Sequence, residues 1–417
     1  LKDSSEKAFE NFVDKLLTDK KFGEHQARYW LDAVRYGDTH GLHLDNKRGI
    51  YPYRDWVVRA FNNNLHVDDF ITWQLAGDLL PDPSLEQRVA TGFVRMNPST
   101  SEGGAIPAEF QAKNNFDRTE NLGTVFLGMS LVCARCHTHK YDPIPQTEYY
   151  RLMAFFNSTA ESPMDGNKYE YGPVMRAPKN QIEWDKWNEL EKEQDSIISA
   201  AKSLLSRIRL RDPKKLNAFE KADRTGKLEL IAKPLNFFEG HEFVEQAQQL
   251  LPKMAAIKKG FTTTLVAKEL PKARETKLLH RGEYNQPEGE SLKPGIISVA
   301  ASFPPDAESN RLGLAKWLTS ADNPLTSRVL INRVWAQVFG VPLVRTPEDF
   351  GLQGEQPTHP ELLDWLAVEF RESEWDFKHM LKLMVLSETF QQSSAWRSDV
   401  DDPENRLFGR GPRYRLD

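Results

Sequence analysis

The sequence predicts a mainly α-helical protein, with two helical lobes joined by a long helical arm and a small β element. Apolar residues recur at helical spacing toward both ends of the 417-residue chain. A charged, heptad-like segment occupies the middle, and β-branched alternation is confined to one short stretch after it. We therefore place the haem-motif helical domain at 1–160, the arm at 161–261, the β element with a linker at 262–305, and a C-terminal helical domain at 306–417.

Length, charge and composition limit the classes of function. A chain of 417 residues can bury two or three separate cores. The net charge of −5 arises from 55 basic and 60 acidic residues, so the charge balance gives no sign of nucleic-acid binding. The sequence contains no apolar run long enough for a membrane span. Its ten tryptophans suit packed cores or a large flat cofactor.

The first domain is predicted to be a series of short helices. Residues 5–36 have the spacing of two helices, which Phe22 and Gly23 interrupt. A polar loop at 37–53 follows and contains His40 and His43. Further helices are predicted at about 52–62, 68–75, 84–96, 108–132 and 147–157.

The middle and the end of the chain have different patterns. Residues 181–211 are charged and heptad-like, 241–259 repeat this pattern, and 212–240 are expected to be loosely ordered. Alternating β-branched residues at 262–268 and 276–282 predict a pair of strands. Helices of the last domain are predicted at 311–319, 324–339, 359–371 and 376–390.

Both cysteines of the chain lie in the motif Cys133-Ala134-Arg135-Cys136-His137. The spacing Cys-x-x-Cys-His is typical of c-type haem attachment, in which two thiols bond the porphyrin and the histidine ligates the iron. We therefore expect covalently attached haem c, with Cys133 and Cys136 as its anchors and His137 as the metal ligand. Three alternatives stay open: a zinc or other metal site, a redox dithiol, although no βαβ pattern surrounds it, and a strained disulfide.

Other polar residues are candidates for the same site. His40 and His43 lie in a loop long enough to cover a haem, so they are candidates for the sixth ligand or a distal catalytic group. Arg118 is the third catalytic candidate, and His139 and Lys140 are expected to bind propionates or carboxylates of the cofactor. Surface, capping or salt-bridge roles are the alternative for each. The far wall of the cleft is expected to come from Asn332, Arg333, Trp335, Asp349 and His359.

Two functions of other classes also fit the sequence. The first is an enzyme that acts on a polymer such as a carbohydrate, in which the cysteine motif is structural or binds another metal. Such chemistry uses paired carboxylates, and the candidate pairs are Glu102 with Glu109 and Asp349 with Glu355. The second is a surface scaffold that docks a partner through the helical arm at 181–211.

Longer motifs resemble a known pair of domains. In the first part of the chain the motifs are Tyr53-Arg54-Asp55-Trp56-Val57, Gln74-Leu75-Ala76-Gly77-Asp78, Glu102-Gly103-Gly104, residues 133–143 and Tyr149-Tyr150-Arg151-Leu152. Through these motifs it resembles a domain of unknown function, from planctomycete and related bacteria, that typically follows a planctomycete-type cytochrome c domain. The last part resembles the usual companion domain through Asn332-Arg333-Val334-Trp335, residues 345–351 and residues 359–365.

The resemblance implies export to the periplasm or cell surface and a redox context. It also implies a longer polypeptide, with a cytochrome domain before Leu1 and a continuation past Asp417. The expected function is thus that of an extracytoplasmic c-type haem protein with an electron-transfer or oxidoreductase role. Its expected partners are other cytochrome domains or redox proteins, without nucleic acid and without a transmembrane segment in this chain.

Overall fold

A computed structural model describes residues 5, 7–208, 213–233 and 238–414. Within these residues the fold has sixteen α-helices and only two small two-stranded sheets, so the prediction of a mainly α-helical protein is confirmed. The chain forms two compact units. The first unit comprises Leu1–Leu79, Glu86–Pro173 and Leu265–Asp417, and the second comprises Leu80–Leu85 and Val174–Thr264. None of the described helices is both long enough and apolar enough to cross a membrane.

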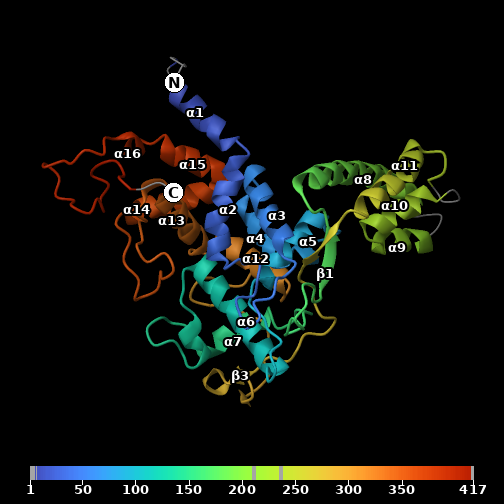
Figure 1. Cartoon of the computed structure of the whole chain (residues 1–417), viewed down its shortest axis with the longest axis horizontal. Coiled ribbons are helices and arrows are strands. Elements are labelled where there is room, and N and C mark those ends of the chain that lie inside the picture. Colours follow the sequence, from blue (N-terminus) through green and yellow to red (C-terminus); the bar gives the residue numbers. More distant parts are fainter. Residues whose placement is uncertain (1–4, 6, 209–212, 234–237, 415–417) are drawn as a thin grey trace. The chain divides into compact units, whose positions relative to one another are not determined.

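Figure 1 shows the N-terminal helices of the first unit as ribbons, and large buried aromatic side chains pack between them. Trp56 stacks on Phe70 with ring centroids 5.1 Å apart, and Trp30 Nε1 and Tyr53 Oη both donate hydrogen bonds to Oε1 of the fully buried Gln74. A buried amide oxygen with two donors fixes how α2 (Lys21–Ala33), α3 (Tyr51–Asn62) and α4 (Val67–Ala76) pack. The other helices before residue 160 are α1 (Ala8–Leu17), α5 (Leu85–Ala90), α6 (Pro107–Leu122) and α7 (Gln146–Ala154).

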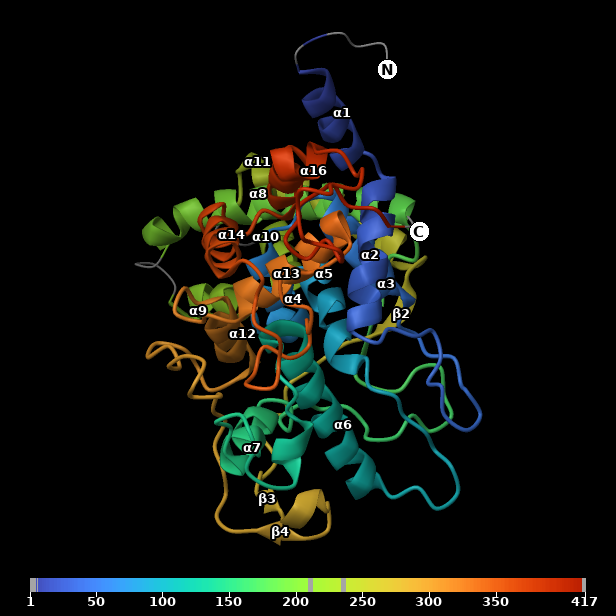
Figure 2. The same cartoon turned by 90° about the vertical axis from the view of Figure 1, so that its left-hand side faces the viewer.

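The C-terminal helices lie beside N-terminal helices of the first unit although more than 150 residues separate the two groups in sequence. In Figures 1 and 2, α12 is next to α4, and the two elements pack against each other. The α13 helix has its own aromatic core, in which Trp335 stacks on Phe339 with centroids 3.9 Å apart. The C-terminal helices are α12 (Arg311–Thr319), α13 (Thr326–Phe339), α14 (Pro360–Glu372), α15 (Phe377–Val385) and α16 (Glu388–Gln391).

The predicted helix at 108–132 ends earlier than expected. The regular helix α6 stops at Leu122, a π-helical turn covers Gly123–Leu127, and Gly128 has a left-handed conformation with φ of 57°. A Cβ at Gly128 would lie 2.8 Å from the Phe350 ring, so the chain reverses where it meets the C-terminal part. The cysteine motif therefore lies in a separate 3-10 turn, η4 (Val132–Arg135).

The second unit is a small helical bundle. Its helices are α8 (Gln181–Ile208), α9 (Pro213–Lys221), α10 (Arg224–Ala232) and α11 (Glu242–Lys258). The expectation that 212–240 is loosely ordered is wrong for the residues of α9 and α10. Asp223 caps α10 by accepting a hydrogen bond from Gly226 N, and Leu228 and Ile231 of that helix are fully buried.

Strands shorter than predicted occur within both stretches, but they do not pair with each other. Strand β2 (Thr262–Leu265) pairs with β1 (Val174–Ala177). Strand β3 (Leu278–Leu279) instead pairs antiparallel with β4 (Pro287–Glu288). The reason is a reversal of the chain directly after β3, where Arg281 and Gly282 both have positive φ, 49° and 78°.

Candidate functional site

The two cysteines of the motif are free thiols in different environments. Cys133 is exposed, whereas Cys136 is half-buried. The Cys136 thiol is in hydrogen-bonding contact with the Arg135 guanidinium, and a Cβ at Gly282 would be 3.4 Å from its Sγ. The turn after β3 therefore covers one sulfur and leaves the other open to solvent.

The η4 turn is held by helices on both sides of it. Tyr150 Oη and Gln146 Nε2, both from α7, donate to the carbonyl oxygen of Arg135 at 2.9 and 3.1 Å. The Arg135 side chain lies over the Phe116 ring of α6, 5.0 Å from its centroid, and its Nη1 is 3.5 Å from Glu120. This turn thus presents the thiols from a fixed backbone.

The prediction of covalently attached haem c is wrong. In the described residues, which include the whole motif, no three His, Cys, Asp or Glu side chains form a group that could hold a metal ion. The physical reason lies in the turn, because one sulfur faces solvent while the other is covered by Arg135 and the 280–282 turn. Cys133, Cys136 and His137 therefore belong to no metal-binding group among the described residues, which rules out the zinc alternative as well.

The residues that follow the cysteines form a loop fixed to the C-terminal part. His137 is exposed, and its Nδ1 lies 2.7 Å from the carbonyl oxygen of Thr138. His139 Nδ1 accepts a hydrogen bond from Asp142 N at 2.8 Å, while Asp142 Oδ1 accepts one from Leu352 N at 2.7 Å. In this arrangement His139 orders the loop and Asp142 joins it to residues near 350.

Lys140 is an exposed residue of the same loop. Its Nζ lies 5.1 Å from the centroid of the neighbouring Tyr141 ring. A cation over an exposed ring is a weak contact, which leaves this ammonium group largely solvated.

His40 and His43 occupy contrasting positions in the polar loop. His40 is 5% exposed, its Nδ1 accepts a hydrogen bond from Ser99 N at 3.1 Å, and its Nε2 is 3.9 Å from Asp165 Oδ2. Burial, reinforced by the charge of Arg48, lowers the pKa of His40 to about 4. His43 is half-exposed, with Nδ1 3.0 Å from Glu102. His40 is thus a neutral buried acceptor near neutral pH, with partners from loops other than the cysteine motif.

Arg118 is the centre of a buried polar network. Its guanidinium donates to Asn97 Oδ1 at 2.8 Å and to Thr159 Oγ1 at 3.1 Å, and it forms an ion pair with Glu161. Burial alone would raise the pKa of Glu161, but the charges of Arg118 and Arg95 outweigh it and lower that pKa to about 2. In these contacts the guanidinium donors of Arg118 bind residues of neighbouring loops.

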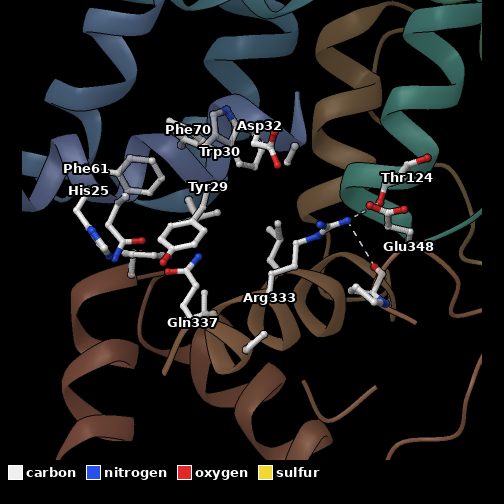
Figure 3. A pocket seen from close by; sticks show the side chains of 18 of the residues that line it. His25, Tyr29, Trp30, Asp32, Phe61, Phe70, Thr124, Arg333, Gln337 and Glu348 are labelled. Carbon is white, nitrogen blue, oxygen red and sulfur yellow. Dashed lines mark hydrogen bonds between the residues drawn. The ribbon is translucent and has the colours of Figure 1, made fainter. Parts of the chain in front are cut away.

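A cavity of about 970 Å³ lies elsewhere in the first unit, between α2 and α13 (Figure 3). Tyr29 and Trp30 of α2, with Phe61 and Phe70, give it aromatic walls. Arg333 and Gln337 enter from α13, and the side chains of Tyr29 and Gln337 extend toward each other. Concave sites with aromatic walls and a few polar groups are typical of small-molecule binding.

Three buried polar atoms of this cavity lack hydrogen-bond partners in the described part of the chain. They are Gln26 Oε1, Arg333 Nε and Gln337 Oε1. Gln26 is only 6% exposed. Arg333 Nη2 donates to Thr124 O at 3.1 Å, and burial lowers the pKa of Arg333. Buried polar groups in folded proteins are normally paired, so these three atoms make the cavity a candidate binding site.

The sequence analysis identified only part of this cavity. Arg333 was expected in a cleft wall, but Gln26, Tyr29 and Gln337 were missed. One sequence signal was available, because Gln26 and Tyr29 lie on the same helical face as the buried Trp30. A glutamine on a core-facing stripe needs hydrogen-bond partners, and only the folded structure shows that Gln26 Oε1 has none among the described residues.

The candidate carboxylate pairs are occupied by separate contacts and do not line this cavity. Each acid has its own partner: Glu102 contacts His43, Glu109 contacts Lys113, Asp349 accepts from Gly351 N, and Glu355 contacts Arg406.

Two protein families match the chain, and both are described as proteins of unknown function. Residues 1–161 match PSCyt2, protein of unknown function (DUF1549), and residues 310–417 match PSD1, protein of unknown function (DUF1553). The chain belongs to this planctomycete-type pair of families. No curated protein and no solved structure matches it. In this pair, α2 and α6 of the DUF1549 part and α13 of the DUF1553 part line the same cavity.

Proposed function

We propose that this protein is an extracytoplasmic thiol–disulfide oxidoreductase whose reactive groups are Cys133 and Cys136. The observation that carries this proposal is the difference between the two free thiols, one exposed and one covered. Dithiol exchange needs an accessible sulfur for attack and a second sulfur close enough to resolve the intermediate. Export, which the family resemblance implies, would bring the dithiol into a compartment where disulfides form.

The backbone of the η4 turn keeps the two sulfurs within reach of each other. Cys136 N donates to the carbonyl oxygen of Cys133 at 3.2 Å, which closes a turn between these positions. Such a turn holds the two α-carbons within about 7 Å, a separation that a disulfide can span with some strain. A strained disulfide is more oxidising and more easily exchanged than a structural one.

The proposed reaction transfers two electrons to the disulfide of a partner protein. The Cys133 thiolate attacks one partner sulfur, a mixed disulfide forms, and the other partner sulfur leaves as a thiolate that takes up a proton. Cys136 then gives up its proton and attacks the Cys133 sulfur, which releases the second partner thiol. The products are a Cys133–Cys136 disulfide and a reduced partner, and the reverse sequence oxidises a partner dithiol.

Arg135 supports this role by its position beside Cys136. Burial opposes the charge of its guanidinium, but Glu120, with smaller contributions from Tyr149 and Cys136, raises the pKa of Arg135. The guanidinium is thus a cation in contact with the sulfur of the proposed resolving cysteine. Arg135→Met is therefore expected to slow the resolving step more than the first attack.

The test is to mix the reduced full chain with oxidised glutathione and follow the products by mass spectrometry. The wild type should form the intramolecular disulfide and release two reduced glutathiones per chain. Cys136→Ser should stop at a mixed disulfide on Cys133, whereas Cys133→Ser should react much more slowly. Equal reactivity of the two cysteines, or glutathione adducts on both without a Cys133–Cys136 bond, would contradict the proposal.

A further inference from the structure

We propose that the cavity between α2 and α13 binds a neutral polyhydroxylated ring compound of the saccharide class. This inference is independent of the dithiol, because the cavity includes neither cysteine. It depends on the three buried polar atoms that have no hydrogen-bond partner in the described ranges, on the aromatic walls and on the balance of charges. Each of these restricts the chemistry of the ligand in a different way.

The unpartnered atoms require a ligand that both donates and accepts hydrogen bonds. Gln26 Oε1 and Gln337 Oε1 are acceptors, and Arg333 Nε is a donor. Leaving such groups buried and unpaired is unfavourable, so a ligand that satisfies all three gains specificity. A hydroxyl group donates one hydrogen bond and accepts two. A compound with several hydroxyls therefore matches all three atoms.

The aromatic walls require an apolar face on the same ligand. Tyr29 and Trp30 lie on α2, and Phe61, Phe70 and Phe377 complete this part of the lining. Tyr29 and Gln337 are close to one another in Figure 3, so a ring that contacts the tyrosine face also comes near the amide. A saccharide ring has C–H groups on its faces and hydroxyls around its edge, which fits this juxtaposition.

The charges in the lining favour a neutral ligand. An anionic ligand would face the carboxylates of Asp32, Glu120 and Glu348. A cationic ligand would face Arg333 and Arg35, although Arg35 is paired with Asp117 at 2.6 Å. A ligand of either charge would therefore meet side chains of the same charge in the lining. The volume of about 970 Å³ is at the upper end of the range for small-molecule sites, which suits an oligosaccharide better than a single sugar.

The experiment measures binding of maltotriose, cellotriose and xylotriose to the reduced full chain by saturation-transfer NMR and calorimetry. We expect saturable binding of at least one trisaccharide. Gln337→Leu and Arg333→Met should each weaken it about tenfold, because each leaves the ligand with an unmatched polar group. Gln356→Leu, which changes an exposed glutamine outside the cavity, should bind like the wild type.

Two further measurements make the outcome decisive. Choline and trigalacturonic acid represent the cationic and anionic classes, and preferential binding of either would overturn the assignment to neutral saccharides. Failure of all three neutral trisaccharides to bind at millimolar concentration would overturn it as well. Thermal unfolding identifies any variant that fails to fold, in which case Tyr29→Ala replaces it. Glutathione exchange at Cys133 should be unchanged in the cavity variants, so this proposal and the dithiol proposal fail separately.

Discussion

Arg311 donates hydrogen bonds from Nη1 and Nη2 to the two carboxylate oxygens of Asp78, at 2.9 and 2.7 Å, while its own side chain is completely buried. Its Nε donates to Glu269 at 2.9 Å. Asp78 lies in the DUF1549 match and Arg311 in the DUF1553 match. A bidentate guanidinium–carboxylate pair fixes both distance and orientation, so this contact sets how the two family domains meet.

Arg311→Met should therefore destabilise the protein by about 3 kcal/mol, because two mostly buried carboxylates lose their counter-charge. Urea unfolding followed by circular dichroism measures this loss. Arg328→Met is the matched control, since its ion pair with Asp364 is largely exposed and should contribute less than about 1 kcal/mol. Equal losses of unfolding free energy in the two variants would contradict a larger contribution from the buried Arg311 pair.

The lowered pKa of His40 should make the free energy of unfolding depend on pH. Its pKa is about 4 in the folded protein and 6.5 as the ordinary value, so the unfolded chain takes up a proton at higher pH than the folded one does. The free energy of unfolding should fall as the pH decreases from about 6.5 to about 4. His40→Asn should reduce this slope, and His43→Asn, at an exposed position, should keep it. Denaturant titrations at pH 7, 5.5 and 4.5 compare the three proteins.

Substitutions at Arg118 and Glu161 should be strongly coupled in their effect on the free energy of unfolding, because the two residues form a buried ion pair. Arg118→Met leaves a carboxylate with 1% exposure unpaired and should cost about 3–5 kcal/mol. Replacing both residues by methionine should cost clearly less than the sum of the single replacements, because neither charge then stays buried alone. A double-mutant cycle by urea unfolding gives the coupling, and additive losses would contradict it.

Replacing Gly128 by alanine should destabilise the protein for two reasons. Alanine there would need a φ of 57° and would place its Cβ 2.8 Å from Phe350 and 2.9 Å from Val329. We expect a loss of about 2–4 kcal/mol from backbone strain together with repacking. Gly104→Ala separates the two effects, because Gly104 also has positive φ, 93°, but nothing lies within 4 Å of the added Cβ. The difference between the two melting temperatures reports the packing contribution.

The sequence predicted local structure better than contacts between distant segments. Helices such as 359–371 were predicted because proline and amphipathic spacing act within a few residues. The strands at 262–268 and 276–282 were assigned wrong partners, since pairing depends on where the chain reverses, which the conformation of Arg281 and Gly282 decides.

The cysteine motif shows the same division between local and distant information. Its spacing is local, but the environment of each sulfur depends on Arg135 and on a turn almost 150 residues later. For the cavity, the sequence predicted Arg333 as a wall residue. It gave no way to see that Gln26 and Gln337 line one cavity with side-chain oxygens that have no hydrogen-bond partner among the described residues. Such a deficit of hydrogen bonds becomes visible only when two remote helices are placed side by side.

The cavity walls come from both halves of a two-family chain, with Gln26 on one side and Gln337 on the other. Neither half alone can enclose a molecule there. Inheritance of the two halves as one polypeptide would preserve that shared surface, whereas separation of their genes would leave two open grooves. Among relatives, changes at the α2 position should accordingly be accompanied by compensating changes in α13.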